Sequence, residues 1–319
     1  MTPMSKILVT GANGFIGKAL VERLTTNRHS VRAMIRSPSR CSHSQVECVV
    51  ADLSDDRGLH LACADVSCVI HLAGRAHIIK ERVTSSLEAF REVNVNGTVA
   101  LIQAAARSGV SRFVFVSSIG VNGDRTDGRP FSENSVPEPC SDYGRSKYEA
   151  ELALISCCEQ AGIEWVIVRP PMVIDSNAPG NFARLLRLVD RGVPMPFGQD
   201  CNQRSLVSLQ NLVSLLERCA EHPLAAGEVF LAADGDNVST REIISSLAHG
   251  MGRSARLFPA PVSIIGLTCR LLGRQRLFNQ LFGSLQIDST KAQRILGWLP
   301  RESTHQALVR IGHEYRVRF

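Results

Sequence analysis

A tyrosine and a lysine at helical spacing are the residues of this 319-residue chain best suited to moving a proton. Tyr143 and Lys147 are four positions apart, which places them on one face of a helix. An ammonium group close to the phenol would favour phenolate, so Tyr143 could exchange a proton near neutral pH. The pair Ser117-Ser118, about 25 residues before Tyr143, supplies a hydroxyl that could hydrogen-bond the oxygen of a substrate. The alternative is a surface Tyr and Lys on an ordinary helix.

A glycine-rich loop near the start of the chain predicts a dinucleotide site. The loop follows the apolar run Ile7–Val9 and leads into a helical pattern with the spacing Gly-x-x-Gly-x-x-Gly. Glycines here allow a tight turn and a close approach to pyrophosphate, and the helix N-terminus favours its charge. This spacing differs from the Gly-x-Gly-x-x-Gly of many dehydrogenases. The residues expected to contact the cofactor are Gly11, Asn13, Gly14, Phe15, Ile16 and Gly17.

Two further strand ends carry candidate cofactor residues. Asp52 and Leu53 follow the third apolar run, and the segment His71-Leu72-Ala73-Gly74 ends the fourth. The carboxyl ends of parallel strands meet at one crevice, so we expect Asp52, Leu53, Leu72, Ala73 and Gly74 beside the dinucleotide. Taken singly, these residues could equally be a helix cap and a turn of small residues.

The second apolar run bears on the choice between NAD and NADP. No Asp or Glu lies between Ser30 and Gln45, whereas Arg32, Arg36 and Arg40 do. A carboxylate there would hold the ribose hydroxyls of NAD, and a guanidinium would pair with the 2′-phosphate of NADP. We therefore expect NADP, with Arg36 as its contact, and keep NAD as the alternative. Solvent-facing arginines on a basic surface would give the same pattern.

Apolar runs alternate with helical patterns over the first half of the chain, which predicts an α/β fold. Near-continuous apolar runs fit strands buried on both faces of a parallel sheet. The runs are Ile7–Val9, Ser30–Ile35, Val46–Val50, Cys68–Leu72, Phe113–Val116 and Trp165–Val168, and the helical stretches include Phe15–Thr26, Phe90–Arg107 and Ser146–Gln160. We expect a Rossmann-like, doubly wound parallel sheet with a smaller C-terminal substrate-binding lobe.

The pattern loosens beyond Pro171, which suggests how the chain divides. A helical stretch, Leu209–His222, and a strand, Glu228–Ala232, read as a return to the sheet. We expect residues 1–172, with roughly 205–235, to form the dinucleotide-binding domain. Residues 173–204 and 236–319 would form the substrate-binding lobe.

The composition of the chain bears on whether it binds nucleic acid, metal ions or membranes. The net charge of +6 is spread along the chain without a basic stripe, so we expect no nucleic acid. Ten cysteines without a Cys-x-x-Cys pair predict reduced thiols, no metal site and, with no signal segment, a cytoplasmic protein. The apolar tract Ala260–Leu272 is too short to span a bilayer. We expect it to pack on the substrate lobe without stable membrane insertion, with an amphipathic membrane-surface helix as the alternative.

These motifs, taken in order, resemble the extended short-chain dehydrogenase/reductases, and among them the nucleotide-sugar epimerase/dehydratase group. The resemblance covers nearly the whole chain. Its motifs are Thr10-Gly11-x-x-Gly14-Phe15-Ile16-Gly17, Asp52-Leu53, His71-Leu72-Ala73, Asn94-Val95-x-Gly97-Thr98, Ser117-Ser118, Tyr143-x-x-x-Lys147, Arg169-Pro170, Asp288-Ser289-Thr290-Lys291-Ala292 and Leu296-Gly297-Trp298.

The resemblance implies a role for each matching residue. Tyr143 would be the acid/base, Lys147 would activate it and bind the cofactor ribose, and Ser118 would hold the substrate oxygen. Further cofactor contacts would come from Asn94, Pro170 and Val173, and substrate contacts from Ser118, Asn122, Asn181, Phe182, Phe197, Arg204 and Arg276. Asn122 replaces a tyrosine of the wider family and Ile174-Asp175 a Tyr-Gly pair, which puts the identity of the sugar in doubt.

A narrower likeness joins the chain to a subgroup of bacterial surface-polysaccharide (lipopolysaccharide, O-antigen) pathways. It rests on Ser117-Ser118-Ile119, Arg169-Pro170-Pro171, Gly180-Asn181-Phe182 and Asn202-Gln203-Arg204-Ser205. The subgroup implies a reductase acting on the C4 ketone of a UDP-4-keto-6-deoxy-N-acetylhexosamine. The alternatives are a UDP-sugar 4-epimerase with bound NAD and a catalytically silent NAD(P)-binding regulator. Family members are often homodimers, so a homodimer is expected here.

Overall fold

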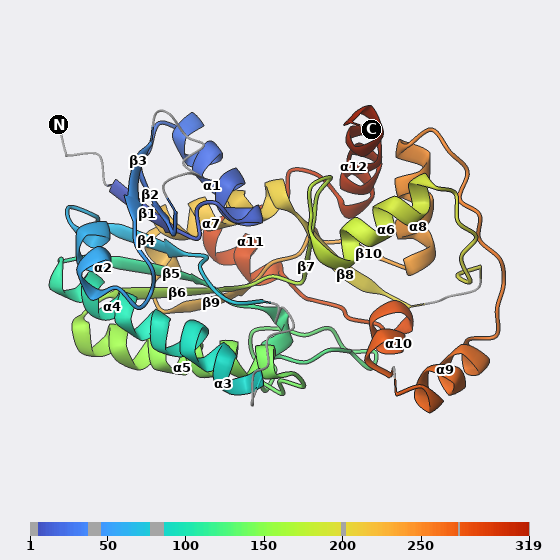
Figure 1. Cartoon of the computed structure of the whole chain (residues 1–319), viewed down its shortest axis with the longest axis horizontal. Coiled ribbons are helices and arrows are strands. Elements are labelled where there is room, and N and C mark those ends of the chain that lie inside the picture. Colours follow the sequence, from blue (N-terminus) through green and yellow to red (C-terminus); the bar gives the residue numbers. More distant parts are fainter. Residues whose placement is uncertain (1–5, 38–45, 77–85, 199–201, 274, 319) are drawn as a thin grey trace.

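The computed structural model describes residues 6–37, 46–76, 86–198, 202–273 and 275–318, apart from a few side chains in α9 (Val262–Leu271) and α10 (Gln275–Phe282). Within these ranges the chain forms a large parallel sheet covered by helices on both faces, and a smaller lobe beside its carboxyl edge (Figure 1).

The large sheet has the strand order β3-β2-β1-β4-β5-β6-β9, and every neighbouring pair is parallel. Its central strands are buried along almost their whole length, as expected for a sheet packed on both faces. The strands are β1 (Lys6–Thr10), β2 (Ser30–Ile35), β3 (Glu47–Val50), β4 (Cys68–His71), β5 (Arg112–Val116), β6 (Glu164–Arg169) and β9 (Glu228–Leu231). The predicted Rossmann-like fold is confirmed.

Two helical layers enclose this sheet. One face packs against α1 (Phe15–Thr26), α7 (Leu209–Glu221) and α11 (Thr290–Leu296) in a single apolar cluster. The other face packs against α2 (Asp56–Cys63), α4 (Gly97–Arg107) and α5 (Asp142–Ala161), with the short α3 (Ser86–Arg91) alongside. The helix expected at Phe90–Arg107 is interrupted by a π-helical turn, Glu92–Asn96. Such turns occur frequently at functional sites.

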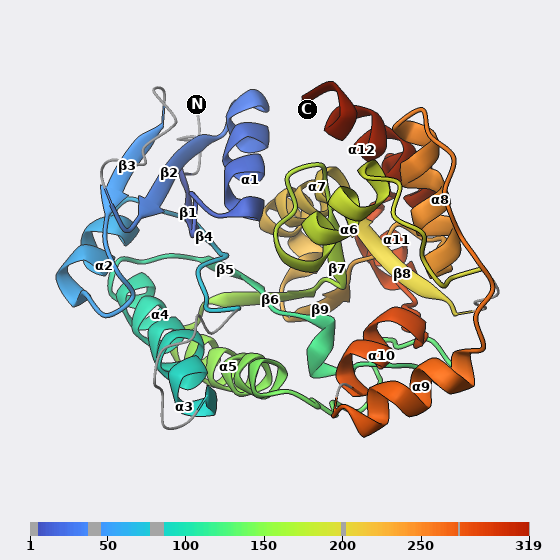
Figure 2. The same cartoon turned by 45° about the vertical axis from the view of Figure 1, so that its right-hand side comes forward.

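The smaller lobe is built on a three-stranded sheet, ordered β10-β8-β7. Its strands are β7 (Met172–Ile174), β8 (Arg204–Ser208) and β10 (Asn237–Val238). They share a second core with α6 (Gly180–Asp190), α8 (Thr240–Gly250) and α12 (Thr304–Arg318), seen together in Figure 2. Because β8 belongs to this small sheet, the boundary proposed at residue 205 falls inside a strand of the other lobe.

The structure bears on two expectations from the sequence, which concern the cysteines and the membrane. Among the described cysteines, seven are free thiols but Cys48 is disulfide-bonded, so the prediction of reduced thiols throughout is wrong for Cys48. In the part of the chain that the structure describes, no helix is long and apolar enough to cross a membrane.

Candidate active site

The loop between β1 and α1 has the geometry of a phosphate-binding turn. Gly11 has φ +65°, and a Cβ there would lie 2.8 Å from the amide nitrogen of Ala73. A Cβ on Gly17 would lie 2.1 Å from the carbonyl oxygen of Gly11, so both positions require glycine. Among the described residues, no side chain caps the amides of the first turn of α1. These amides are open to an anion.

Two adjoining pockets meet at this loop, and both include Gly11, Gly14, Leu72 and Gly74. The first runs toward α5 and the smaller lobe, and is further lined by Phe15, Ile16, Gly17, Arg75, Ala76, Asn94, Val116, Ser117, Ser118, Tyr143, Lys147, Pro170, Pro171 and Val173. The second runs toward β2 and β3, and is further lined by Asn13, Met34, Ile35, Arg36, Ser37, Ala51, Asp52, Leu53, Ser54, Ala73, Glu92, Val93, Asn96, Gly97 and Ala100. Together they form one elongated cleft.

The arginines after the glycine loop have different surroundings. Arg36 is exposed and lines the second pocket. Arg32 is buried, pairs with Glu47 at 2.7 Å and donates to carbonyls at the C-terminal end of α2, including that of Ala62 at 3.0 Å. A cation at a helix C-terminus is favourable, so Arg32 is a structural residue rather than a phosphate ligand. Arg40 lies outside the described residues.

A buried histidine fixes the end of β4 against the glycine loop. The ring of His71 lies 2.7 Å from Thr10 Oγ1 and 3.0 Å from Thr98 Oγ1. Thr10 Oγ1 also accepts a hydrogen bond from the backbone amide of Ala73 at 3.2 Å. Burial, with the positive charge of Lys147, lowers the pKa of His71 to about 3, so the ring is neutral. His71 appears in the sequence motif, but its bridging role was not predicted.

Asn94, in the π-helical turn, holds the edge of the first pocket. Its Oδ1 accepts from the backbone amide of Arg75 at 2.8 Å, and its Nδ2 donates to the carbonyl of Arg75 at 3.1 Å and to Ser146 Oγ at 3.0 Å. These contacts make Asn94 a positioning residue for the loop after β4. The same contacts place Arg75, which belongs to none of the sequence motifs, on the pocket wall.

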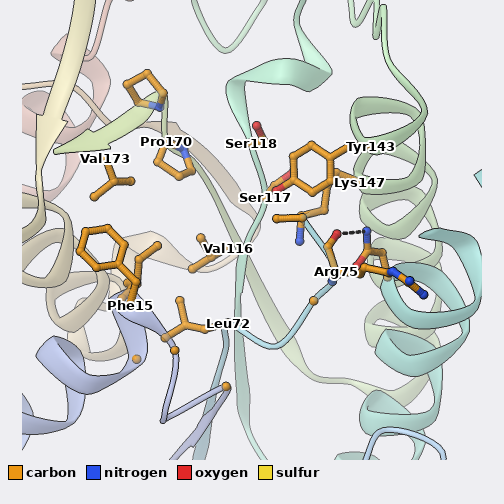
Figure 3. Close-up of a pocket in the computed structure, with 18 residues that line it drawn as sticks. Phe15, Leu72, Arg75, Val116, Ser117, Ser118, Tyr143, Lys147, Pro170 and Val173 are labelled. Atoms are coloured by element: carbon orange, nitrogen blue, oxygen red, sulfur yellow. Dashed lines mark hydrogen bonds between the residues drawn. The ribbon is translucent and has the colours of Figure 1, made fainter. Parts of the chain in front are cut away.

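Ser118, Tyr143 and Lys147 lie together on one side of the first pocket, across from Phe15 and Val173 (Figure 3). Ser118 follows β5 and accepts a hydrogen bond from the amide of Gly120 at 3.1 Å. Tyr143 and Lys147 come from the start of α5, where Ser141 caps the helix by accepting from the amide of Gly144 at 3.0 Å. The structure thus brings the three predicted catalytic side chains together.

Burial sets the protonation behaviour of this group. Burial lowers the pKa of Lys147 to about 7, although the negative charge of Glu151 acts in the opposite direction. The Nζ atom of Lys147 lies 4.1 Å from the ring centroid of Phe115. Burial raises the pKa of Tyr143 to about 12, and a hydrogen bond with Ser118 works in the opposite direction. The phenol is therefore protonated in the ligand-free protein. Any interaction that keeps Lys147 charged draws the pKa of Tyr143 down.

A buried ion pair lies one helical turn beyond Lys147. Arg169 on β6 donates to both carboxylate oxygens of Glu151, at 2.9 and 2.6 Å, and to Asn122 Oδ1 at 3.1 Å. The two charged side chains are 7% and 2% exposed. This bidentate pair ties α5 to the sheet close to the predicted catalytic residues.

We expect Glu151→Gln to lower the free energy of unfolding by about 3–5 kcal/mol, because it leaves the Arg169 charge buried without a counter-charge. Urea unfolding measures this loss. The matched control is Asp56→Asn, which removes the exposed Arg107–Asp56 pair and should cost less than about 1 kcal/mol. Equal losses in the two variants would contradict the assignment of a structural role to the buried pair.

The residues expected to contact the sugar nucleotide are mostly placed elsewhere. Phe182 and Phe197 are buried in the core of the smaller lobe, where Phe197 packs on Phe282 with ring centroids 5.0 Å apart. Asn122 is buried against Arg169, and Arg204 donates to the carbonyl of Gly283 at 2.9 Å. None of these four residues lines either pocket as the structure describes them.

The remaining residues in question have other surroundings. Asn181 is exposed at the start of α6. The side chain of Arg276, in α10 (Gln275–Phe282), lies outside the described part. The pair Ile174-Asp175 stands where the wider family has Tyr-Gly. Ile174 is a core residue, and Asp175 Oδ1 accepts a hydrogen bond from the amide of Asn177 at 2.9 Å.

Comparison with known proteins identifies the family. A model of the NAD dependent epimerase/dehydratase family matches residues 7–233, which covers the glycine loop and the three residues predicted to be catalytic. The chain belongs to this family. A UDP-glucose 4-epimerase of Vibrio cholerae is 38% identical over 305 residues, covering 94% of this chain and 92% of the relative. This member is therefore an NAD-dependent enzyme of the nucleotide-sugar epimerase/dehydratase type, as the motifs implied.

The chain is also similar to two further proteins, one by sequence and one by structure. The N-acetyl-alpha-D-glucosaminyl-diphospho-ditrans,octacis-undecaprenol 4-epimerase of Escherichia coli O157:H7 is 25% identical, over 82% of this chain and 78% of the relative. MoeE5, solved with UDP-glucuronic acid and NAD, matches at 25% identity and a TM-score of 0.78, over 98% of this chain and 99% of that one.

The cleft of this family member fits a nicotinamide dinucleotide. Asn13 Oδ1 and Ser117 Oγ are buried without a hydrogen-bond partner among the described residues, and both side chains lie at the cleft. Buried polar atoms normally have partners, so their position here fits atoms that a bound ligand satisfies. With the open amides of α1, the residues present suit a dinucleotide that spans both pockets.

Proposed function

We propose that this protein is a UDP-sugar 4-epimerase that keeps its NAD bound. The observation that carries the proposal is the convergence of Ser118, Tyr143 and Lys147 at one end of a dinucleotide cleft. The same trio would serve a reductase, and the 38% identity to the Vibrio cholerae UDP-glucose 4-epimerase favours epimerisation. In this role the enzyme inverts the C4 carbinol of the sugar.

Each residue of the trio has a distinct task in the proposed reaction. Tyr143 takes the proton from the C4 hydroxyl and later returns a proton to the C4 oxygen. Ser118 holds that oxygen by a hydrogen bond, and the Lys147 ammonium favours the phenolate form of Tyr143. NAD held in the cleft would supply the acceptor and then the donor of the C4 hydride. The keto sugar must turn in the pocket between the two transfers, so that hydride returns to its opposite face.

Arg36 favours a second candidate, a 4-ketoreductase that uses NADPH. Its exposed guanidinium lines the adenosine end of the cleft, and no carboxylate occupies the described part of the segment that follows β2. A guanidinium there suits a 2′-phosphate. In that case Tyr143 would protonate the C4 oxygen of a UDP-4-keto-6-deoxy-N-acetylhexosamine, and NADPH would supply the hydride. Synthesis of surface polysaccharide would use either product.

The deciding experiment begins with the purified protein and identifies the nucleotide that denaturation releases. UDP-glucose and UDP-N-acetylglucosamine are then supplied without added cofactor, and the 4-keto sugar is supplied with NADPH. If the protein is an epimerase, denaturation releases NAD, and a UDP-sugar is converted to an equilibrium mixture of its two C4 epimers. Stoichiometric loss of NADPH absorbance with the keto sugar, and no isomer from any UDP-sugar, would instead establish the reductase.

We expect Arg36→Glu to weaken binding of NADPH by tenfold or more, because placing a carboxylate at the 2′-phosphate costs more than about 1.4 kcal/mol. Affinity for NADH should not fall, because a carboxylate at this place can hold the ribose hydroxyls. Quenching of nicotinamide fluorescence measures both affinities. The control is Arg57→Glu, an exposed arginine of α2 outside both pockets. Equal losses for NADPH and NADH would show that Arg36 does not reach the ribose.

A homodimer remains a prediction of the family resemblance, and a cytoplasmic location remains a prediction from the composition of the sequence. Light scattering on the purified protein determines the number of chains in the assembly.

A further inference from the structure

The hairpin of α9 (Val262–Leu271) and α10 carries an exposed apolar face that the proposed function does not use. Leu267 and Leu271 are four residues apart, so they share one face of α9, and Leu272 follows directly. Their exposed fractions are 60%, 79% and 65%. Isolated exposed leucines are ordinary, but three within six residues at one helix end form a patch.

The opposite side of α9 explains why the hairpin keeps this face outward. Gly266 lies so close to α10 that a Cβ there would be 3.1 Å from the ring of Phe278. Phe278 stacks on Phe282, with ring centroids 5.2 Å apart, and Phe282 packs on Phe197 of the lobe core. The hairpin is thus fastened through one apolar side. α9 lies at the outer corner of the molecule in both views (Figures 1 and 2).

Charge identifies the kind of surface that would cover the patch. From residue 243 to residue 287 the sequence contains five arginines and no Asp or Glu. Arg270 is exposed on α9, and Arg256 is exposed on the segment that leads into it. Leucines beside arginines, without acidic residues, are the composition of helices that lie in the interface of an anionic bilayer.

A second copy of the chain fits this patch less well. The commonest dimer places the same surface on both subunits, so Arg270 would face the equivalent region of its partner. Without acidic residues in this stretch, such an interface would bring positive charges together with nothing in the hairpin to neutralise them. An anionic surface would neutralise them directly.

We propose that the α9–α10 hairpin docks this enzyme reversibly on an anionic phospholipid surface. Leu267, Leu271 and Leu272 enter the boundary between headgroups and acyl chains, while Arg256 and Arg270 contact lipid phosphates. Ten helical residues are about 15 Å long, roughly half of the hydrocarbon thickness, so the helix lies on the membrane and does not cross it. Arg204 hydrogen-bonds Gly283 at the end of α10, so the substrate lobe would sit beside the lipid surface.

Co-sedimentation of the full-length protein with vesicles tests this proposal. We expect binding to vesicles of phosphatidylglycerol and phosphatidylethanolamine, and much weaker binding to phosphatidylcholine alone. The triple variant Leu267→Ser, Leu271→Ser, Leu272→Ser should bind at least about tenfold more weakly. Arg256→Gln with Arg270→Gln should lose about fivefold per arginine and reduce the salt dependence.

The matched control removes three leucines of similar exposure elsewhere. Leu61, Leu152 and Leu224 are 56%, 52% and 64% exposed on other elements, and their replacement by serine should leave vesicle binding unchanged. Binding by the Leu267/Leu271/Leu272 variant equal to that of wild type would overturn the proposal. So would a wild-type dimer that this variant converts to monomer, without vesicle binding. The assay needs no sugar substrate, so its outcome is independent of the proposed function.

Discussion

Tyr143→Phe should reduce turnover by about 10³-fold, the scale of general acid–base catalysis, while leaving the affinity for the dinucleotide nearly unchanged. The phenol lies in the first pocket with Ser118 and Lys147 and is the group best placed to exchange the C4 hydroxyl proton. Phenylalanine keeps the ring and its edge contact with Phe90, at 5.9 Å between centroids, so the fold should persist. Coupled assays measure kcat, and fluorescence measures cofactor affinity.

The matched control for this variant is Tyr148→Phe. Tyr148 is a half-buried tyrosine on the same helix, but it lines neither described pocket. Its loss should leave kcat unchanged. If Tyr143→Phe retained wild-type turnover, Tyr143 would not be the acid/base, and a catalytically silent NAD(P)-binding regulator would become the better account.

Lys147→Met should abolish most activity and at the same time stabilise the ligand-free protein. Burial lowers the pKa of Lys147 to about 7. The native state therefore binds fewer protons than the unfolded chain between pH 7 and the ordinary lysine pKa near 10.4. Native stability falls as the pH drops through that window, because the unfolded chain takes up the proton first. Methionine removes this cost without leaving a cavity.

The stability gain of Lys147→Met over wild type should reach about 1–3 kcal/mol at pH 7 and shrink toward pH 10. Turnover should fall by about 10²-fold or more, because the phenol loses its neighbouring charge. Thermal unfolding from pH 7 to 10 measures the first effect. Lys18→Met, on the exposed side of α1, is the control and should show no such dependence. A destabilised Lys147→Met protein would contradict the cost assigned to the buried amine.

The sheet and its cofactor loop follow from local sequence rules. The helix predicted at Phe15–Thr26 has those bounds in the structure. The glycine loop ends directly before it, and its buried residues recur at helical spacing. Helical spacing also placed Tyr143 and Lys147 on one face. Such features depend on residues close together in the chain, so periodicity and spacing are enough to find them.

Long-range packing accounts for what the sequence did not predict. Arg32 is one of the three arginines that tilt the sequence toward NADP, but in the structure its side chain donates to carbonyls at the end of α2. Phe182 and Phe197 resemble substrate residues by position, but the smaller lobe needs them in its core. The hydrogen bonds of His71 to Thr10 and Thr98 join three separate elements. Contacts of this kind depend on tertiary geometry, which spacing alone does not give.

Epimerisation through hydride transfer at C4 is the central claim, and isotope retention tests it most directly. UDP-glucose and UDP-N-acetylglucosamine carrying deuterium at C4 are incubated with the protein, without added cofactor, and followed by NMR. The proposed mechanism predicts C4 epimers that keep the deuterium at C4, with no exchange into water. Epimers that have lost the label, or no epimer from either UDP-sugar, would contradict it.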